Sequence, residues 1–243
     1  MGEDGSRGRN PRRGVLTDET RRAFFGRRKG HRLRPHQAAL IDGLLPQLAL
    51  PLRQPVPRDL ASLFVNPVDD VRLEIGFGGA EHLLAQAWAN PRVGFIGCEP
   101  FLNGMAKALA GITGLGLTNV RLHLGDAIAV IDWLPPRSIA AADLLYPDPW
   151  PKRRHWKRRF VQDARLTEVA RILRPGAEFR FATDSTDYAA WTLLRFLRSP
   201  DFEWTAERAD DWRRPWADYV TTRYEQKARR DGSAPCYLVF RRR

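Results

Sequence analysis

Cysteine is nearly absent from this chain of 243 residues, which excludes the protein classes that depend on it. The two cysteines, Cys98 and Cys236, lie far apart in apolar runs and form no Cys-x-x-Cys pair. The sequence therefore predicts neither a disulfide framework nor a zinc site. We expect both thiols to be buried and reduced, and we expect no bound metal.

The chain also lacks a long uninterrupted apolar run. Its most apolar segment, residues 38–52, is broken by Asp42, Pro46 and Pro51, whereas a membrane-spanning helix needs about 20 mostly apolar residues. The beginning of the sequence has no apolar stretch of the kind found in secretory signals. We therefore expect a cytoplasmic protein that does not bind membranes, and a monomer, because no long apolar stripe is left over.

Lysine is scarce as well: five of the 40 basic residues are Lys, so the net charge of +12 rests on arginine. The cations are clustered, with eleven against four acids in residues 1–34, and six with no acid in residues 152–159. A genome rich in arginine codons would raise the total, but the clustering favours a nucleic acid partner. Because residues 1–34 are rich in Gly and Arg, we expect a mobile basic arm before one domain, residues 35–243.

From Val71 onward, short apolar runs alternate with segments of helical period. The runs that predict strands are 71–75, 93–98, 120–124, 142–146 and 178–182, and the segments that predict helices are 80–89, 102–110, 127–134, 157–173 and 188–198. We expect Pro175 and Gly176 to end the helix over 157–173. This alternation is typical of a doubly wound, mostly parallel α/β sheet of the Rossmann-like kind. Two last strands, 202–206 and 236–240, are expected to make an antiparallel C-terminal edge.

The first predicted strand runs into a glycine-rich turn, where Glu74 precedes Gly76 and Gly78. Glycines let a ligand approach the backbone at a helix N-terminus, and Glu99, at the end of the next strand, can accept both hydroxyls of a ribose. A tight turn with a solvated Glu99 is the alternative. NAD and S-adenosylmethionine both suit such a site. The Gly-x-Gly-Gly spacing and the acid before the turn favour the cationic S-adenosylmethionine.

Acids follow the later strands too. Asp126 lies where it could bind an adenine amino group, although a plain helix N-cap explains it nearly as well. Asp148 and Asp184 follow the fourth and fifth predicted strands. Ligands of open parallel sheets bind beyond the carboxyl ends of the strands, so we expect these acids to converge with Glu74 and Glu99 at one edge.

Asp148 lies in a proline-rich loop, residues 147–151, that opens onto the basic block of residues 152–159. Proline fixes its own φ, so the loop is expected to be stiff and to aim Asp148 and Trp150. Cations in a first helical turn oppose the helix dipole by about 0.3–1 kcal/mol each. Phosphate contacts explain the block better, with Trp150 or Trp156 stacking on a base. A solvated charged face with both tryptophans in the core is the alternative.

Together these motifs resemble the bacterial tRNA (guanine-N7)-methyltransferases over residues 25–243. The likeness rests on Glu-Ile-Gly-Phe-Gly at 74–78, Glu99, Gly-Asp-Ala at 125–127, Pro-Asp-Pro-Trp-x-Lys-x-Arg-His-x-Lys-Arg-Arg at 147–159, Ala-Thr-Asp at 182–184 and Thr-x-Tyr-Glu at 222–225. Tyr146, Arg223 and Gly79-Ala80 depart from the family pattern without removing a polar group on which the chemistry depends. Taken alone, residues 221–227 would be a surface loop.

The resemblance implies a class I methyltransferase that uses S-adenosylmethionine to methylate N7 of guanosine 46 in the variable loop of tRNA. It implies that Asp148 is catalytic. It also implies three sets of contacts: with S-adenosylmethionine from Glu74, Gly76, Gly78, Glu99, Asp126 and Asp148; with the RNA substrate from Lys152, Asp184, Thr222, Arg223, Tyr224 and Glu225; and with the rest of the tRNA from Arg154, His155, Trp156, Lys157, Arg158 and Arg159.

Guanine N7 has a lone pair and no proton, so the transfer is a direct displacement that needs no obligatory base. Asp148, with Asp184 or Glu225, is expected to accept hydrogen bonds from the guanine N1–H and amino groups. Two other protein classes share single features of this sequence. The intact set of acids argues against an RNA-binding protein with an inactive methyltransferase fold. The glycine spacing, with no Tyr-x-x-x-Lys or histidine relay, argues against an NAD-dependent oxidoreductase.

Overall fold

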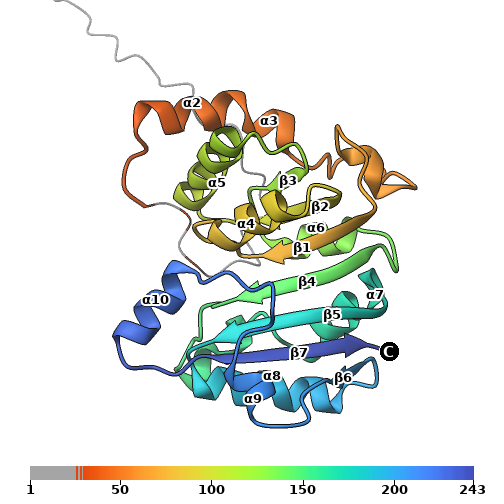
Figure 1. Ribbon diagram of the computed structural model, residues 1–243, viewed down its shortest axis with the longest axis vertical. Helices are drawn as coiled ribbons and strands as arrows, with labels where there is room; N and C mark the ends of the chain where they lie inside the picture. Colours follow the sequence, from red (N-terminus) through yellow and green to blue (C-terminus); the bar gives the residue numbers. More distant parts are fainter. Residues whose placement is uncertain (1–25, 27, 29) are drawn as a thin grey trace, which may run out of the picture.

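A seven-stranded sheet in the order β3-β2-β1-β4-β5-β7-β6 runs through the computed structural model (Figure 1), which describes residues 26, 28 and 30–243. The strands are β1 Asp70–Ile75, β2 Val93–Cys98, β3 Val120–His123, β4 Ile139–Leu145, β5 Leu173–Thr183, β6 Phe202–Trp204 and β7 Cys236–Arg242. The first five pair in parallel, and β7 pairs antiparallel with β5 and β6. The predicted doubly wound sheet with an antiparallel C-terminal strand is confirmed, and β6 forms the edge.

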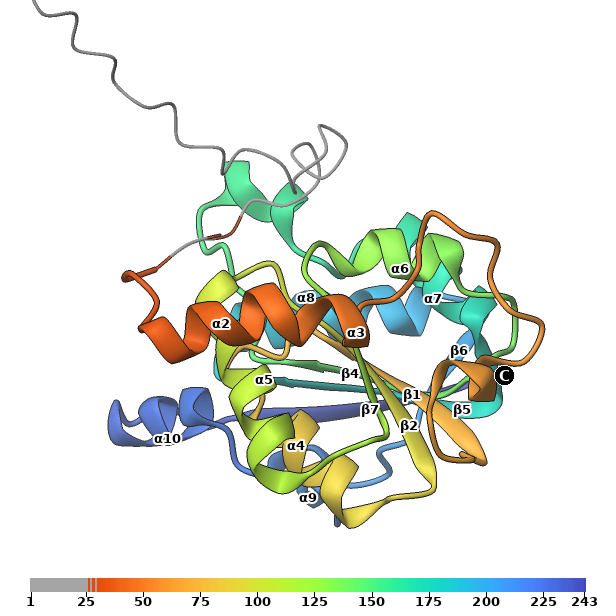
Figure 2. The ribbon, with the colours of Figure 1, turned by 90° about the horizontal axis from the view of Figure 1, so that it is seen from above.

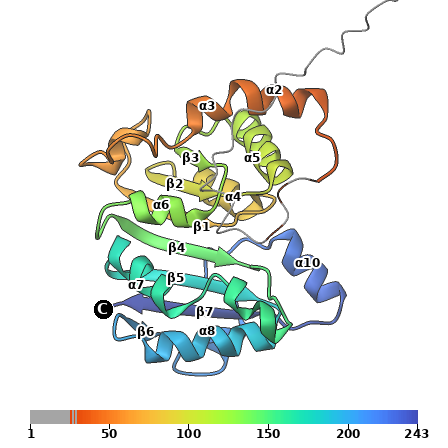
Figure 3. The same cartoon turned by 180° about the vertical axis from the view of Figure 1, so that it is seen from behind.

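Helices cover both faces of the sheet. They are α2 Pro35–Gly43, α3 Leu45–Leu48, α4 Glu81–Ala89, α5 Leu102–Leu115, α6 Ala127–Trp133, α7 Asp163–Ile172, α8 Thr186–Arg198, α9 Asp210–Arg213 and α10 Arg223–Arg230, with 3-10 turns η1 Leu60–Leu63 and η2 Arg153–Arg158. One face carries α4 and α5 and the other carries α6, α7 and α8 (Figures 2 and 3). The core is accordingly divided into a cluster on each face, and α10 stands at the carboxyl ends of the parallel strands.

Helix α5 shows how the sequence pattern produces an element. Met105, Ala108, Leu109 and Ile112 follow the i, i+3, i+4, i+7 spacing, and all four are buried against the sheet. An apolar stripe of this spacing stabilises a helix mainly through packing. Gly116 ends the helix in the left-handed conformation at φ 63°, where glycine carries no steric penalty.

The helix predicted over residues 157–173 is wrong in its first part. The basic block forms η2, and α7 begins at Asp163, after the Gln162 side chain has donated hydrogen bonds to the carbonyls of Trp156 and Arg159 at 2.8 and 3.2 Å. Acids, unlike cations, are favourable in a first helical turn. The helix also ends earlier than predicted, at Ile172, so that Pro175 and Gly176 lie within β5.

The loop predicted over residues 221–227 is also wrong, because the chain forms α10 there. Thr222 is its N-cap and accepts a hydrogen bond of 3.3 Å from the backbone nitrogen of Glu225. The Thr-x-x-Glu spacing is that of a capping box, and it could have predicted the helix start.

The predicted arm, residues 1–34, lies mostly outside the described residues. Its last part contacts α5: the backbone nitrogen of Leu102 donates to the carbonyl of Arg28 at 3.0 Å, and that of Gly30 donates to Asn103 Oδ1 at 2.8 Å. The Asn103 amide in turn donates to the carbonyl of His31 at 2.8 Å. The chain is therefore attached to α5 at Arg28, Gly30 and His31.

Candidate active site

A cavity of about 660 Å³ opens at the carboxyl ends of the parallel strands. This volume lies within the range of roughly 300–1,000 Å³ that is typical of small-molecule sites. Gly76, Glu99, Asp126 and Asp148 line it, one from the end of each of β1, β2, β3 and β4, and Tyr224 of α10 lies on its wall. The structure thus brings together four predicted positions that are separated by up to 72 residues in sequence.

The glycine turn forms the cavity floor from backbone atoms. Gly76 and Gly78 have φ angles of 71° and 56°, in the left-handed region that favours glycine. A Cβ built on Gly76 would meet no protein atom within 4 Å, so the turn leaves space for a ligand. A Cβ on Gly104 of α5 would collide with the carbonyl oxygen of Gly78, so α5 packs directly onto the turn.

Glu99 is held by backbone donors on both oxygens. Its Oε2 accepts a hydrogen bond from the nitrogen of Gly78 at 2.6 Å, and its Oε1 accepts one from Phe101 at 2.8 Å. Burial raises the pKa of the Glu99 carboxyl, against the two hydrogen bonds, which lower it. The carboxylate is therefore fixed at the cavity, with its remaining lone pairs available for hydroxyl donors.

Asp126 caps α6, as the alternative interpretation of the sequence proposed. Its Oδ1 accepts a hydrogen bond from the backbone nitrogen of Ile128 at 3.0 Å, and the residue also lines the cavity. Burial raises the pKa of this carboxyl as well. Capping uses only one of its two oxygens, so the N-cap and a ligand contact are compatible.

Asp148 lies on the cavity wall in a loop of constrained backbone. Tyr146 and Trp150, two residues to either side, have φ angles of 49° and 44°, a conformation that costs bulky residues about 1–3 kcal/mol each. Loss of hydration at the cavity wall raises the pKa of the Asp148 carboxyl. The guanidinium of Arg158 lies 4.8 Å from the centroid of the Trp150 ring and helps to hold that ring in place.

The basic block divides into an exposed part and a buried part. Lys152, Arg154 and Lys157 are exposed, whereas the side chain of Arg159, for which the sequence predicts a contact with RNA, is completely buried. Trp156 packs edge-on against Trp191 with ring centroids 5.2 Å apart, which fits the alternative of a core anchor. His155 packs edge-on against Trp150, and Arg158 lines the cavity.

The start of α10 covers the glycine turn. A Cβ on Gly78 would lie 2.8 Å from Cε2 of Tyr224, and the Arg223 guanidinium lies over Gly79 and pairs with Glu81. Glu225 is 1% exposed, and its Oε1 accepts hydrogen bonds of 2.8 Å from the Tyr237 hydroxyl and from Arg229 Nε. Tyr224 is therefore the member of this segment that the structure places on the cavity wall.

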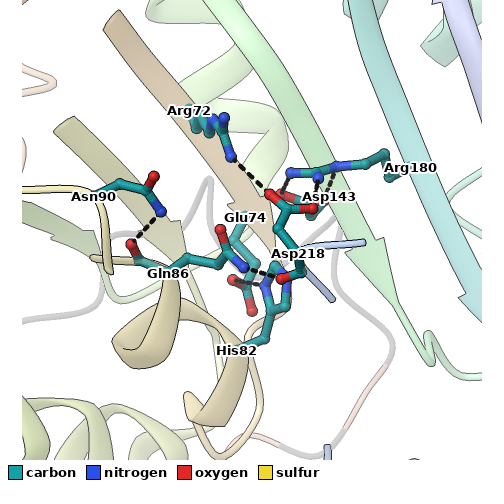
Figure 4. Close-up of polar contacts among 8 residues, drawn as sticks. All are labelled: Arg72, Glu74, His82, Gln86, Asn90, Asp143, Arg180 and Asp218. Carbon is teal, nitrogen blue, oxygen red and sulfur yellow. Dashed lines mark hydrogen bonds and ion pairs between the residues drawn. The ribbon is translucent and has the colours of Figure 1, made fainter. Parts of the chain in front are cut away.

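Glu74 and Asp184 do not line the cavity with the other predicted acids. Asp184 is exposed, and Glu74 is buried, with its Oε2 2.9 Å from Nδ1 of His82 (Figure 4). Burial opposes a charge on His82, but the Glu74 carboxylate outweighs it and raises the pKa of the imidazole. Glu74 therefore belongs to a polar network behind the glycine turn.

This network attaches the segment before α10 to the sheet. Arg180 of β5 pairs with Asp143 of β4 at 2.8 Å and with Asp218 at 3.0 Å, while Arg72 of β1 reaches Asp218 at 3.4 Å (Figure 4). The Gln86 amide donates to the backbone carbonyl of Asp218. Asp218 lies four residues before Thr222, so these contacts fix where α10 begins.

Several cavity residues carry no signal in the sequence. Phe160, Gln162 and Arg165 line the cavity, whereas the sequence pattern predicts a continuous helix over these residues. Gly104 shows no local signal, because its requirement for a small side chain comes from Gly78, which is distant in sequence.

In the described part of the chain, no group of three or more His, Cys, Asp or Glu side chains could hold a metal ion. No helix there is long and apolar enough to cross a membrane.

Residues 69–237 match the model of a family described as "Putative methyltransferase", and the protein is accordingly a methyltransferase of the class I fold. The tRNA (guanine-N(7)-)-methyltransferase of Rhodopseudomonas palustris (strain BisB5) is 60% identical over 220 residues, covering 90% of this chain and 86% of the relative. That of Bradyrhizobium diazoefficiens is 57% identical over 225 residues, with coverages of 93% and 95%. The chain belongs to the tRNA (guanine-N7)-methyltransferase family.

Among solved structures, an rRNA methylase from Streptococcus thermophilus aligns with a TM-score of 0.49 and 11% identity, covering 75% of this chain and 91% of that one.

Proposed function

We propose that this protein transfers a methyl group from S-adenosylmethionine to N7 of a guanine in tRNA, at position 46 of the variable loop. The observation that carries the proposal is the cavity wall, where the glycine turn, Glu99, Asp126 and Asp148 meet at the ends of four neighbouring strands. The names of the relatives support tRNA as the substrate and guanine N7 as the acceptor.

The residues of the cavity fit S-adenosylmethionine. Glu99 can accept hydrogen bonds from both ribose hydroxyls, and the second oxygen of Asp126 can accept one from the adenine amino group. The open space beside Gly76 admits a ligand against the backbone. When bound, the cofactor supplies a methyl group on a sulfonium, whose positive charge suits a site lined by Glu99, Asp126 and Asp148.

Asp148 would select and orient the acceptor base. Its carboxylate accepts hydrogen bonds from the guanine N1–H and amino groups, so that N7 is held toward the methyl group. Adenine lacks this pair of donors and would leave a carboxylate unpaired, at a cost of about 1–3 kcal/mol. The carboxylate also stabilises the positive charge that the ring gains, which is the electrostatic contribution expected when no proton has to be removed.

The acceptor base must leave its stack to reach the cavity. Trp150 and Tyr224 lie on the cavity wall, and either ring can replace the lost stacking. Lys152, Arg153, Arg154 and Lys157 are exposed beside the cavity and would contact phosphates of the tRNA. The cofactor, the acceptor base and the tRNA backbone would then each contact a different part of the same edge of the sheet.

Unmodified tRNA incubated with the protein and methyl-labelled S-adenosylmethionine, followed by nucleoside analysis, tests the proposal. We expect 7-methylguanosine, and we expect no label in a matched transcript with adenosine at position 46. Label in both transcripts would show that the protein methylates a base other than the one at position 46. Calorimetry should show binding of S-adenosylmethionine and not of NAD; binding of NAD alone would favour the oxidoreductase alternative.

A further inference from the structure

Arg159 is the one cation of the basic block whose side chain is completely buried, and its contacts explain why. Its Nε donates a hydrogen bond of 2.8 Å to the carbonyl of Pro149, one residue after Asp148. Its Nη2 pairs with Asp187 in the first turn of α8. The side chain therefore joins the loop after β4 to the helix after β5.

Three aromatic rings surround the same guanidinium. Its central carbon lies 5.1 Å from the centroid of Trp156 and 4.9 Å from those of Tyr188 and Trp191. Cations are attracted to the faces of aromatic rings, most strongly where water is excluded. The guanidinium is thus held by three rings in addition to its contacts with Pro149 and Asp187.

The loop that carries Asp148 has few other attachments. Pro147, Pro149 and Pro151 lack a backbone N–H, so only Asp148 and Trp150 could donate from this loop. Within the part of the chain that the structure describes, the bond from Arg159 is the only hydrogen bond between the backbone of residues 147–151 and the remainder. Proline restricts the shape of the loop, but Arg159 sets its position relative to the sheet edge.

We propose that Arg159 is a positioning residue for methyl transfer: it fixes the Pro149 carbonyl to α8 so that Asp148 stays aligned with the cavity. This inference rests on the proposed function. It also gives Arg159 a different role from its exposed neighbours, which would bind the phosphates of the RNA.

The test compares Arg159→Lys with two other variants of the full-length protein. Lysine keeps the charge but loses the planar fork that reaches Pro149 and Asp187 together. We expect the single-turnover rate of methylation at saturating tRNA to fall about 10- to 100-fold, since a misplacement of about 1 Å costs that order. The Kd for tRNA and its dependence on salt should stay at the wild-type values.

Arg154→Ala removes an exposed cation of the same block and should instead weaken tRNA binding and reduce the salt slope by about 1. Arg171→Lys controls for a general loss of arginine contacts, because Arg171 donates to the carbonyls of Leu134 and Ile131 at 2.7 and 2.6 Å and does not line the cavity. We expect this variant to be less stable and to methylate at the wild-type single-turnover rate.

If Arg159→Lys does not fold, Asp187→Asn decides, because Asp187 is 54% exposed and its loss leaves the Pro149 contact in place. We expect its rate to fall about 3- to 10-fold with tRNA affinity unchanged. A wild-type rate in Asp187→Asn under these conditions, or in Arg159→Lys where it folds, overturns the inference, as does an Arg159→Lys variant that binds tRNA with a reduced salt slope. A wild-type protein that makes no 7-methylguanosine refutes the proposed function instead.

Discussion

Glu99 and Gly78 are joined by a hydrogen bond of 2.6 Å from the backbone nitrogen of the glycine to Oε2 of the carboxylate. The bond connects the end of β2 to the turn that follows β1. Because the other oxygen accepts from Phe101, one side chain sets the course of two loops at the cavity floor. The residue proposed to bind the cofactor, Glu99, therefore also holds the two loops in place.

Glu99→Gln should lower the affinity for S-adenosylmethionine about 10- to 100-fold, since hydrogen bonds to charged groups contribute about 1.5–3 kcal/mol. The amide nitrogen would also face a backbone donor. Calorimetry measures the change, and Asp132→Asn, an exposed acid of α6 outside the cavity, is the matched control with wild-type affinity. Equal affinity in Glu99→Gln and wild type would exclude a cofactor contact at this residue.

Two glycines of α5 should respond in opposite ways to alanine. Alanine is favoured over glycine in helices by about 1 kcal/mol, and a Cβ on Gly114 meets nothing within 4 Å, so Gly114→Ala should stabilise the protein. Gly104→Ala should destabilise it by about 1–3 kcal/mol, because the Gly78 carbonyl blocks the new methyl group. Urea unfolding of the two variants measures their free energies of unfolding. Stabilisation by both substitutions would disprove the close packing of α5 on the turn.

These packing requirements show where the sequence was informative. The alternation of strands and helices predicted the sheet, and the strand-end positions of Glu99, Asp126 and Asp148 placed them at one edge. The position of Glu74 just before the turn predicts the same edge for it, but alternate side chains of a strand point to opposite faces. Its pairing with His82 of α4 follows from how the helix packs on the strand, and no motif in the sequence indicates it.

The basic block was harder to interpret for a related reason. Six cations in eight residues predict a solvated or RNA-binding surface, and nothing local distinguishes Arg159 from Arg158. The difference arises from Asp187 and the rings of Tyr188 and Trp191, which belong to a helix about 30 residues later. When residues distant in the sequence bury a charged side chain, neither composition nor hydrophobic periodicity can predict it.

Stability should depend on pH through Asp148. Loss of hydration raises the pKa of its carboxyl in the folded protein, so the folded state keeps this proton at pH values where the unfolded chain has lost it. Stability then falls as pH rises from the ordinary aspartate range through the raised pKa. Asp148→Asn should become more stable than wild type over that window. Urea unfolding at several pH values measures this; a stability difference that does not change with pH would contradict the assignment.

Asp218 should show the opposite dependence. Burial acts to raise the pKa of its carboxyl, but Arg180 and Arg72 together hold it below the ordinary value. Its contribution to stability is present above the unfolded pKa and is lost as pH falls through the lowered one.

Asp218→Ala should therefore cost about 1 kcal/mol at neutral pH, because the Asp218 side chain is 47% exposed and solvent screens its ion pairs, and it should loosen the segment before α10. Glu203→Ala, which removes an exposed pair with Arg241, should stay within about 0.5 kcal/mol. Urea unfolding gives both values, and limited proteolysis reports the segment. Equal losses in the two variants would mean that the Asp218 network does not hold α10.

Single-turnover methylation of unmodified tRNA by wild-type protein and by Asp148→Ala, read as 7-methylguanosine after digestion to nucleosides, tests the central claim most directly. We predict that the wild type forms 7-methylguanosine and that the variant is slower by about 100-fold or more, the size of effect expected when a group that stabilises developing charge is lost. No 7-methylguanosine from the wild type, or equal rates for the two proteins, would contradict the account.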